Sequence, residues 1–363
     1  MALPVMPPIE PMLAKSAAAV PTGGYLYEPK WDGFRCLAFR NGENIVLQSK
    51  AGQPLGRYFP EIVAALHALP TRKFVLDGEI VIRRGAGLDF DALLQRIHPA
   101  ASRIQRLSLE TPATYMIFDL LVDAKAKSLN AKPLSARRMA LQEFARQYLT
   151  ERAEGFKLTA KKSKTRNSSN AVTRILLSPA SSDFATADKW IREGSTHGWD
   201  GVVAKRLDCE YTSGERTGMV KIKRIRTADC VVGGFRWARK GGEVGSLLLG
   251  LYNNHGQLDH IGFSSAFARE DRKKLKSILK PLIAKDGEGG FTGKAPGGPS
   301  RWTRDDRDTE WVPLKPRLVG EFQYDHFSGH RFRHGTKFLR WRPEKKPEQC
   351  KIDQVTHRKV KIN

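Results

Sequence analysis

The stretch EPKWDGFR, residues 28–35, is the most informative part of this sequence, because it combines a strand end, a turn and reactive side chains. It contains Lys30, Asp32, Gly33 and Arg35 in the spacing K-x-D-G-x-R. Such a pattern arises by chance in roughly one of several hundred chains of this length. The lysine is therefore either an ordinary strand-end residue before an Asp-Gly turn or a nucleophile held beside that turn.

The segments around this stretch predict a domain of mixed strands and helices. Runs of β-branched and aromatic residues between Gly turns indicate strands, and Asn41-Gly42 is typical of a tight hairpin. Apolar residues at helical spacing indicate helices, with Pro60 suited to a first turn and Asp183 to a cap. The expected strands cover residues 25–30, 34–40, 44–50, 73–82, 114–122, 175–179, 199–206 and 218–224. The expected helices cover residues 60–69, 89–97, 134–149 and 183–198.

After about residue 226 the pattern changes to short antiparallel strands joined by Gly and Asn turns, with one helix near residues 268–285. Short strands with a single helix suit a small β-barrel such as an OB-fold. A chain of 363 residues is long enough for two domains. We therefore expect an α+β fold, with antiparallel sheets and flanking helices over residues 1–226 and a small OB-fold barrel with a basic tail over residues 227–363.

Composition narrows the classes of function. Lysine and arginine number 62 against 38 aspartates and glutamates, and this net charge of +24 favours a polyanion such as nucleic acid as partner. No apolar run approaches the roughly 20 residues of a membrane span, and the proline-interrupted N-terminus lacks a signal-peptide pattern. The four scattered cysteines argue against a zinc site or a disulfide framework. We expect a cytoplasmic protein without a membrane partner.

Further motifs follow the first in a fixed order along the chain. They are LDGEIV with Glu79, IFDLL with Phe118, DGVVAKR with Asp200 and Lys205, MVKIKR with Lys221 and Lys223, and RWRPEKKPEQC with Arg342 and Lys345. In this order they resemble the covalent nucleotidyltransferase superfamily of ATP-dependent DNA ligases, RNA ligases and mRNA capping enzymes. The resemblance covers nearly the whole chain and is greatest to the stand-alone C-type repair ligases of mycobacteria.

The resemblance implies a role for each matching residue of the first domain. Lys30 corresponds to the nucleophile that becomes attached to AMP, and Asp32 belongs to the same catalytic motif. The nucleotide would be bound by Glu28 at adenine N6, Phe118 stacked on adenine, Arg35 near the sugar and nick phosphate, Lys50 at a phosphate, Glu79 at the ribose or a metal ion, and Lys221 and Lys223. From its pattern alone, Phe118 is also compatible with a place in the core.

Covalent attachment of AMP requires a neutral amine that attacks the α-phosphate. Lys221 and Lys223 lie two residues apart on an expected strand, so both side chains point to one face. Their charges would favour the neutral form of a neighbouring lysine and offset charge on the phosphates. Without such a lysine, the same K-x-K pattern would indicate only an exposed basic strand.

The resemblance further implies ATP as co-substrate and Mg²⁺ or Mn²⁺ as metal, with Glu79 and Asp200 as metal ligands. Arg342 and Lys345 correspond to residues of the second domain that orient the leaving pyrophosphate. The chain departs from the family pattern at several positions without losing a reacting group. Asp200 replaces the usual Glu, Lys50 an Arg, Met219 a frequent Trp, and Glu344 an Asp. A shorter acid still offers a hard oxygen ligand.

We therefore predict an ATP-dependent DNA ligase that seals 5′-phosphate/3′-hydroxyl nicks through a lysyl-AMP and a DNA-adenylate, in DNA repair. Its partner would be nicked double-stranded DNA, with Ku or a primase-polymerase as candidate protein partners, and the protein would act as a monomer at the bacterial nucleoid. The basic segment 159–170 is expected to contact DNA phosphates. Two alternatives remain: an RNA ligase or other covalent nucleotidyltransferase, and a catalytically inactive nucleic-acid-binding scaffold.

Overall fold

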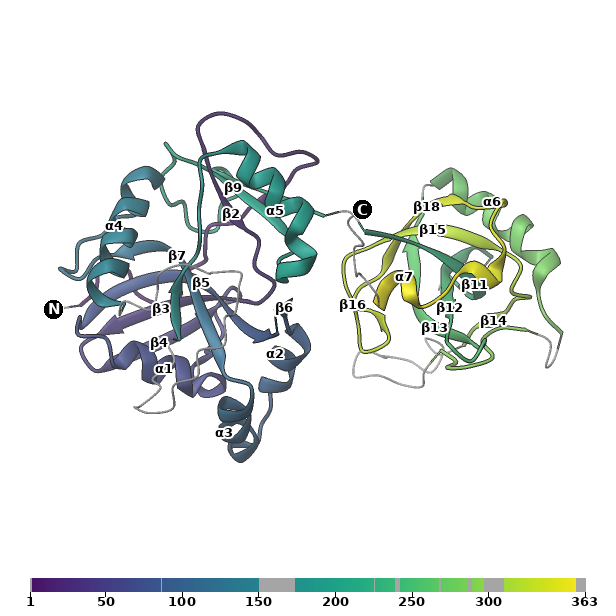
Figure 1. Ribbon diagram of the computed structural model, residues 1–363, viewed down its shortest axis with the longest axis horizontal. Coiled ribbons are helices and arrows are strands. Elements are labelled where there is room, and N and C mark those ends of the chain that lie inside the picture. Colours follow the sequence, from purple (N-terminus) through teal and green to yellow (C-terminus); the bar gives the residue numbers. More distant parts are fainter. Residues whose placement is uncertain are drawn as a thin grey trace, which may run out of the picture. The chain divides into compact units, whose positions relative to one another are not determined.

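A computed structural model describes residues 2–85, 87–149, 174–224, 226–238, 242–267, 269–285, 289–296 and 310–356. The chain divides into two compact units, Met1–Arg224 and Ile225–Asn363, each of which is considered by itself (Figure 1). The basic segment 159–170 lies outside the described residues, so its contact with DNA stays a prediction. None of the helices in the described ranges is long and apolar enough to cross a lipid bilayer.

The first unit contains two sheets. The larger has the order β4-β3-β5-β7-β8, with the short strand β6 paired to β5, and the smaller has the order β1-β10-β9-β2. The larger comprises β3 (Phe34–Asn41), β4 (Asn44–Ser49), β5 (Lys73–Arg84), β6 (Gly87–Leu88), β7 (Ala113–Val122) and β8 (Ile175–Leu177). The smaller comprises β1 (Lys15–Ser16), β2 (Tyr25–Pro29), β9 (Gly201–Arg206) and β10 (Met219–Lys223).

The hairpin predicted at Asn41-Gly42 is confirmed, because Asn41 pairs with Asn44 and Gly42 adopts a φ of 65° in the turn. The expected antiparallel sheets are confirmed, except for the pairings at two edges. Strand β8 runs parallel to β7, and β1 runs parallel to β10. The first of these pairings follows from the chain path, since a helix intervenes between β7 and β8 and returns the chain in the same direction.

Helices cover the sheets of the first unit where the sequence predicted them (Figure 1). Helices α1 (Pro60–His67) and α4 (Leu134–Tyr148) share the main apolar core with the larger sheet, through residues such as Leu66 and Phe144. Helix α5 (Phe184–His197) starts at Asp183, whose side chain accepts two backbone N–H groups, and packs against β2 and β9. Helix α2 (Phe90–Arg96) was also expected, whereas α3 (Ala101–Glu110) was not.

The second unit is a closed barrel. Its main strands are β11 (Arg226–Trp237), β12 (Val244–Tyr252), β13 (Leu258–Ala266), β15 (Val319–Tyr324) and β18 (Thr336–Trp341). Strand β11 pairs with both β12 and β15, which closes the order β11-β12-β13-β18-β15 on itself. Only the β13–β18 pairing among these five strands is parallel. This arrangement, with helix α6 between the third and fourth strands, is an OB-fold.

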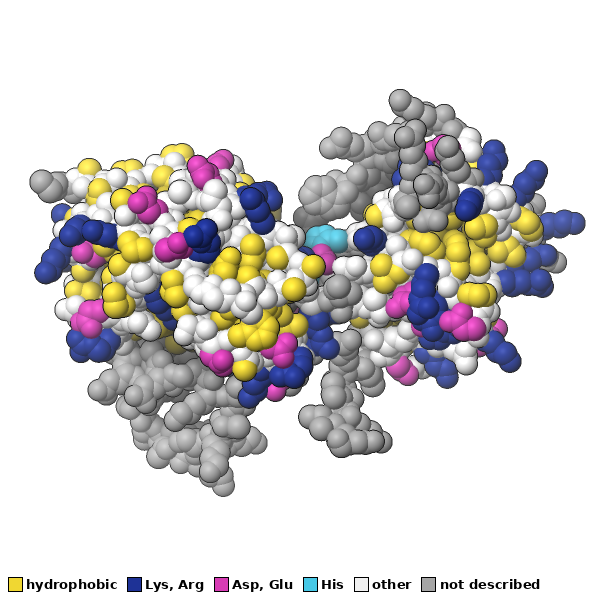
Figure 2. Space-filling model, turned by 90° about the horizontal axis from the view of Figure 1, so that it is seen from above, with side chains coloured by type: hydrophobic (Ala, Val, Ile, Leu, Met, Phe, Trp, Pro, Cys, Tyr) yellow, Lys and Arg dark blue, Asp and Glu magenta, His cyan; other side chains and the backbone are white. Residues whose placement is uncertain are grey.

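The helix of the barrel is shorter than the predicted range 268–285. Helix α6 (Arg269–Leu279) is followed by a single 3-10 turn at Lys280–Leu282, because Pro281 lacks the N–H that another helical turn would need. Short elements complete the unit: β14 (Val312–Pro313), β16 (Phe327–Ser328), β17 (Arg331–Phe332) and α7 (Asp353–Thr356). On each unit, Lys and Arg side chains stand out from the surface seen in Figure 2, with Asp and Glu between them.

Candidate active site

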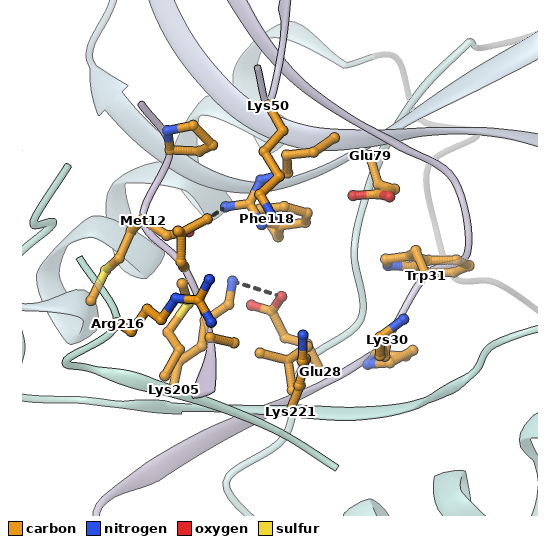
Figure 3. A pocket seen from close by; sticks show the side chains of 17 residues that line it. Met12, Glu28, Lys30, Trp31, Lys50, Glu79, Phe118, Lys205, Arg216 and Lys221 are labelled. Carbon is orange, nitrogen blue, oxygen red and sulfur yellow. Dashed lines mark hydrogen bonds and ion pairs between the residues drawn. The ribbon is translucent and has the colours of Figure 1, made fainter. Parts of the chain in front are cut away.

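A pocket lies between the two sheets of the first unit (Figure 3). The larger sheet contributes Arg35, Glu79 and Phe118, and the smaller contributes Glu28, Val203, Lys205, Met219 and Lys221. An N-terminal strap, Pro11–Ala14, lines the same pocket, as do Lys30, Trp31, Lys50 and Arg216. Seven of the predicted nucleotide-binding residues therefore face one space: Glu28, Lys30, Arg35, Lys50, Glu79, Phe118 and Lys221.

Strand register explains why residues far apart in sequence meet here. Val203 pairs with Glu28 on one side and with Lys221 on the other, so the three form a row across the smaller sheet. In the larger sheet Arg35 pairs with Glu79. Side chains of directly opposed residues lie on the same face of a sheet. The larger sheet thus presents Arg35 beside Glu79 to the pocket, and the smaller presents Glu28 and Lys221 on either side of Val203.

Lys30 is held at the end of β2 by a backbone clasp. Its N–H donates to the Gly201 carbonyl and its carbonyl accepts from the Asp200 N–H, each at 2.9 Å. The ammonium lies 3.1 Å from Asp200 Oδ2, and Lys223 Nζ lies 3.8 Å from the same oxygen. Asp200 is nearly inaccessible, with 3% of its side chain exposed, whereas 20% of the Lys30 side chain is exposed. The described unit thus places Lys30 against a buried carboxylate at the pocket wall.

Two glycines make this close approach possible. Gly201 has a φ of +130°, and a Cβ there would lie 2.0 Å from the Ile222 carbonyl oxygen. A Cβ on Gly33 would lie 2.2 Å from the Ile80 carbonyl oxygen. Any larger residue would push β9 away from β10, or β3 away from β5. The Asp-Gly pairs of the first and fourth motifs therefore have a structural reason as well as a chemical one.

Cations approach the pocket from several sides. In Figure 3, Lys50 enters opposite Lys205 and Lys221. Partial burial lowers the pKa of Lys221, and the like charges of Lys30 and Lys223 lower it further. Removing these like charges from water costs free energy that a bound polyphosphate would offset. The arrangement is therefore suited to a nucleoside triphosphate.

Arg35 is fixed by a buried acid. Asp77, which is fully buried, accepts hydrogen bonds from Arg35 Nε and Nη2 at 2.6 Å each, and a third from the Tyr211 hydroxyl at 2.7 Å. Burial alone would lower the pKa of Arg35, but the charge of Asp77 and its hydrogen bonds raise it above the ordinary value. The guanidinium also lies 4.5 Å from the Phe118 ring centroid. Arg35 is thus a permanently charged, preorganised wall of the pocket.

Phe118 lies both in the core and at the pocket wall, and its stacking on adenine stays a prediction. It is 6% exposed and belongs to a buried aromatic cluster with Trp31 and Trp199, yet it also lines the pocket. Lys205 Nζ lies 4.3 Å from the ring centroid, as a second cation beside Arg35. Such cation–π contacts are attractive in a site shielded from water.

Glu79 carries an unusual carboxyl group. Desolvation raises its pKa to about 7, and the nearby charges of Arg35 and Lys30 only partly oppose that rise. Asp32, the other acid of the first motif, raises it further by like charge. Glu79 therefore changes from a neutral to a charged group close to neutral pH.

We expect the adenylation rate at subsaturating ATP to rise with pH through about 7, because Glu79 is protonated below its raised pKa and ionised above it. The measurement is single-turnover formation of the protein–AMP adduct between pH 5.5 and 8.5. Glu79→Gln should be slower and should lack the inflection near 7. Glu110→Gln, at an exposed position on α3, serves as the control. If the pH–rate profile of Glu79→Gln keeps the inflection near 7, then the inflection belongs to a group other than Glu79.

Arg342 and Lys345 belong to the second unit, in the turn after β18. Both bind Asp229 of β11, with Arg342 Nη1 3.0 Å from Oδ1 and Lys345 Nζ 2.6 Å from Oδ2. Gln354 accepts from the Asp229 N–H and donates to its carbonyl, which fixes the backbone of that acid. The two predicted pyrophosphate residues are therefore held together as a pair on the barrel. His330 and His334 are exposed on the same unit.

Sequence reasoning missed several residues that build the pocket. The strap Pro11–Ala14 has no motif of its own and reaches the pocket because β1 pairs with β10 and Leu13 N–H bonds to the Glu215 carbonyl. Arg216, the residue after Glu215, lines the pocket as well. Asp77 precedes Glu79 by two residues, and this spacing on a strand was the available signal for a shared face.

Known proteins resemble this chain over both units. The sequence matches the ATP dependent DNA ligase domain over residues 11–223 and the ATP dependent DNA ligase C terminal region over residues 240–345. It is 44% identical to DNA ligase C1 of Mycolicibacterium smegmatis and 41% identical to DNA ligase C of Mycobacterium tuberculosis, over 98% of this chain and 96% of each relative. A chain from a structure–function analysis of Lig E DNA ligases has the same fold, with a TM-score of 0.54 at 15% identity over 92% of this chain and 99% of that one.

Proposed function

The chain belongs to the family of ATP-dependent DNA ligases, and from that premise we propose that Lys30 is the residue that carries AMP. The observation that supports this assignment is the position of Lys30 at the pocket wall, beside Asp200 and among the cations that suit a triphosphate. Nicked double-stranded DNA is the substrate that the family seals, with ATP and a divalent metal.

The proposed chemistry proceeds in three displacements at phosphorus. In the first, the Lys30 amine attacks the α-phosphate of ATP, the bond to the bridging oxygen breaks and pyrophosphate leaves. In the second, a 5′-phosphate oxygen of the nick attacks the AMP phosphorus and the Lys30 amine leaves. In the third, the 3′-hydroxyl attacks the activated 5′-phosphate, forms the phosphodiester bond and releases AMP.

The residues of the pocket have distinct parts in this scheme. Asp200 holds the Lys30 side chain in place and is the nearest base to its amine, at 3.1 Å. Lys221 and Lys223 offset the charge that builds on the phosphates, and the fixed guanidinium of Arg35 does so without reorganisation. Lys50 adds a point charge on the opposite side.

Two acids of this unit fit a divalent metal that arrives with ATP. No group of three or more His, Cys, Asp or Glu suited to a metal occurs in the described parts of the chain. Mg²⁺ is commonly bound through one or two carboxylates together with substrate phosphates. Glu79, which lines the pocket, and Asp200, which contacts Lys30, meet that requirement. Such an ion would supply positive charge to the phosphates.

Labelled nucleotides test the assignment directly. The protein is incubated with α-labelled ATP and Mg²⁺, denatured, and cleaved to map the labelled peptide. Label on the peptide with Lys30, and its transfer to nicked DNA on further incubation, would support the proposal. Label on another lysine would contradict it. Parallel incubations with GTP and with nicked RNA address the RNA ligase and capping-enzyme alternatives.

The finer predictions about cellular context are part of the proposal. A role in repair, with Ku or a primase-polymerase as partner, rests on the resemblance to stand-alone repair ligases, as does location at the nucleoid. Acceleration of nick sealing by added Ku would support that partnership.

A further inference from the structure

A buried cluster of three charges lies at one wall of the pocket. Glu28 is 2% exposed, Lys205 is 5% exposed and Arg138 of helix α4 is 7% exposed. Lys205 Nζ is 2.9 Å from Glu28 Oε2, and Arg138 Nη1 is 3.5 Å from Oε1. Within the described residues, Glu28 Oε1, Arg138 Nη1 and Lys205 Nζ make no hydrogen bond. Oε1 of the carboxylate is therefore compensated by the nearby charge of Arg138 rather than by a directed hydrogen bond.

The two cations differ in their relation to the pocket. Lys205 lines the pocket, and its ammonium lies over the Phe118 ring, where the proposed adenine would stack. A bound base would therefore compete with Glu28 and Phe118 for contact with the Lys205 ammonium. Arg138 is not among the residues that line the pocket. It is anchored from behind, where Nη2 donates to the Ser178 carbonyl at 2.7 Å. Arg138 is thus the counter-ion that stays in place whatever Lys205 does.

Ser178 connects this anchor to the catalytic segment. Its hydroxyl oxygen accepts from Trp31 Nε1 at 2.9 Å, and its N–H donates to the Ile117 carbonyl at 2.8 Å. The residue is fully buried. Arg138 is therefore fixed relative to the residue that follows Lys30 and to the strand that carries Phe118.

We propose that Arg138 is a positioning residue that determines base specificity by holding the Glu28 carboxylate in place as a hydrogen-bond acceptor. This inference rests on the proposed contact between Glu28 and adenine N6. An ionised carboxylate accepts the amino group at position 6 of adenine and repels the carbonyl oxygen at position 6 of guanine. Arg138 Nη1 lies 3.5 Å from Glu28 Oε1 and Arg138 Nη2 is anchored on the Ser178 carbonyl, so removal of Arg138 lets the carboxylate turn away from position 6 of the base and weakens the rejection of GTP.

The test is the ratio of single-turnover adduct formation from α-labelled ATP and α-labelled GTP, each at subsaturating concentration, on the full chain. Both rates come from one preparation, so inactive protein cancels in the ratio. Arg138→Met should lower the ATP:GTP ratio by about tenfold or more, the scale of one lost polar discrimination. Arg138→Lys, which retains the charge, should keep most of the preference.

Arg146→Met is the matched control, since Arg146 lies on the same helix in an exposed pair with Glu143 and should leave the ratio unchanged. Arg138→Gln supplies the same readout if the Met variant does not fold. Glu28→Gln tests the contact of Glu28 with the base separately from the role of Arg138. Its amide can donate a hydrogen bond to guanine, so this variant should lower the ATP:GTP ratio by itself. If Glu28→Gln lowers the ratio but Arg138→Met and Arg138→Gln both keep the wild-type ratio, then the role of Arg138 is overturned and the contact of Glu28 with the base stands. A wild-type ratio in Glu28→Gln overturns the proposed contact of Glu28 with the base.

Discussion

Lys30→Ala should form no covalent AMP adduct, yet it should still close a nick that already carries AMP on its 5′-phosphate. The first step requires an amine at the wall of the pocket, and Lys30 is the lysine that β2 and β9 hold beside Asp200. The last step uses the 3′-hydroxyl as nucleophile and AMP as leaving group, so it does not need that amine. The measurements are labelled-adduct formation from ATP and single-turnover sealing of a pre-adenylated nick.

Lys132→Ala, at an exposed lysine of the same unit, should leave both steps unchanged. Thermal unfolding of Lys30→Ala should be measured as a control for folding. Loss of the Lys30 charge leaves Asp200 with Lys223, at 3.8 Å, as a more distant cation. A labelled adduct in folded Lys30→Ala would place the nucleophile elsewhere. Loss of both steps in a folded variant would mean that Lys30 also positions the nick.

Local sequence patterns predicted most of the helices and strands of the fold. The turn at Asn41-Gly42, the cap at Asp183 and the proline at the start of α1 each depend on a few neighbouring residues, and each was predicted. Helix α3 was missed because its buried side chains, Ile104, Leu107 and Ser108, leave only a narrow apolar stripe. The strand β8 was predicted but its parallel pairing was not, and β1 was missed altogether, because the pairing partners lie far away in the sequence.

The motifs identified the residues that face the pocket but not the residues that hold them. Lys30, Glu79 and Phe118 stand in short, recognisable patterns. Arg138 lies in a segment whose spacing indicated only an amphipathic helix, and a buried arginine is contrary to the usual pattern for such a face. Its relation to Glu28 depends on how α4 packs over the larger sheet, which the helix pattern alone does not specify.

Arg342→Ala should slow adenylation from ATP by about 10²–10³, the usual cost of losing one electrostatic donor at a site of developing charge. Charge builds on pyrophosphate as it leaves in the first step, and the resemblance assigns Arg342 and Lys345 to that group. The barrel supports a joint role, because Asp229 holds both cations through its two carboxylate oxygens. Sealing of a pre-adenylated nick releases AMP rather than pyrophosphate, so it should be much less affected.

Arg340→Ala is the matched control on the same strand end, since Arg340 is more exposed and shares the partner Glu321 with Arg342. Arg342→Lys should recover part of the rate, because a lysine keeps the charge but not the planar fork that can bind two oxygens at once. Single-turnover rates of adenylation and of nick closure, measured separately, show whether Arg342 acts on the leaving pyrophosphate or on DNA. If Arg342→Ala slows nick closure as severely as it slows adenylation, then Arg342 acts on DNA rather than on the leaving group. In that case its pairing with Asp229 would serve to present a DNA contact, and Lys345→Ala should show the same uniform loss.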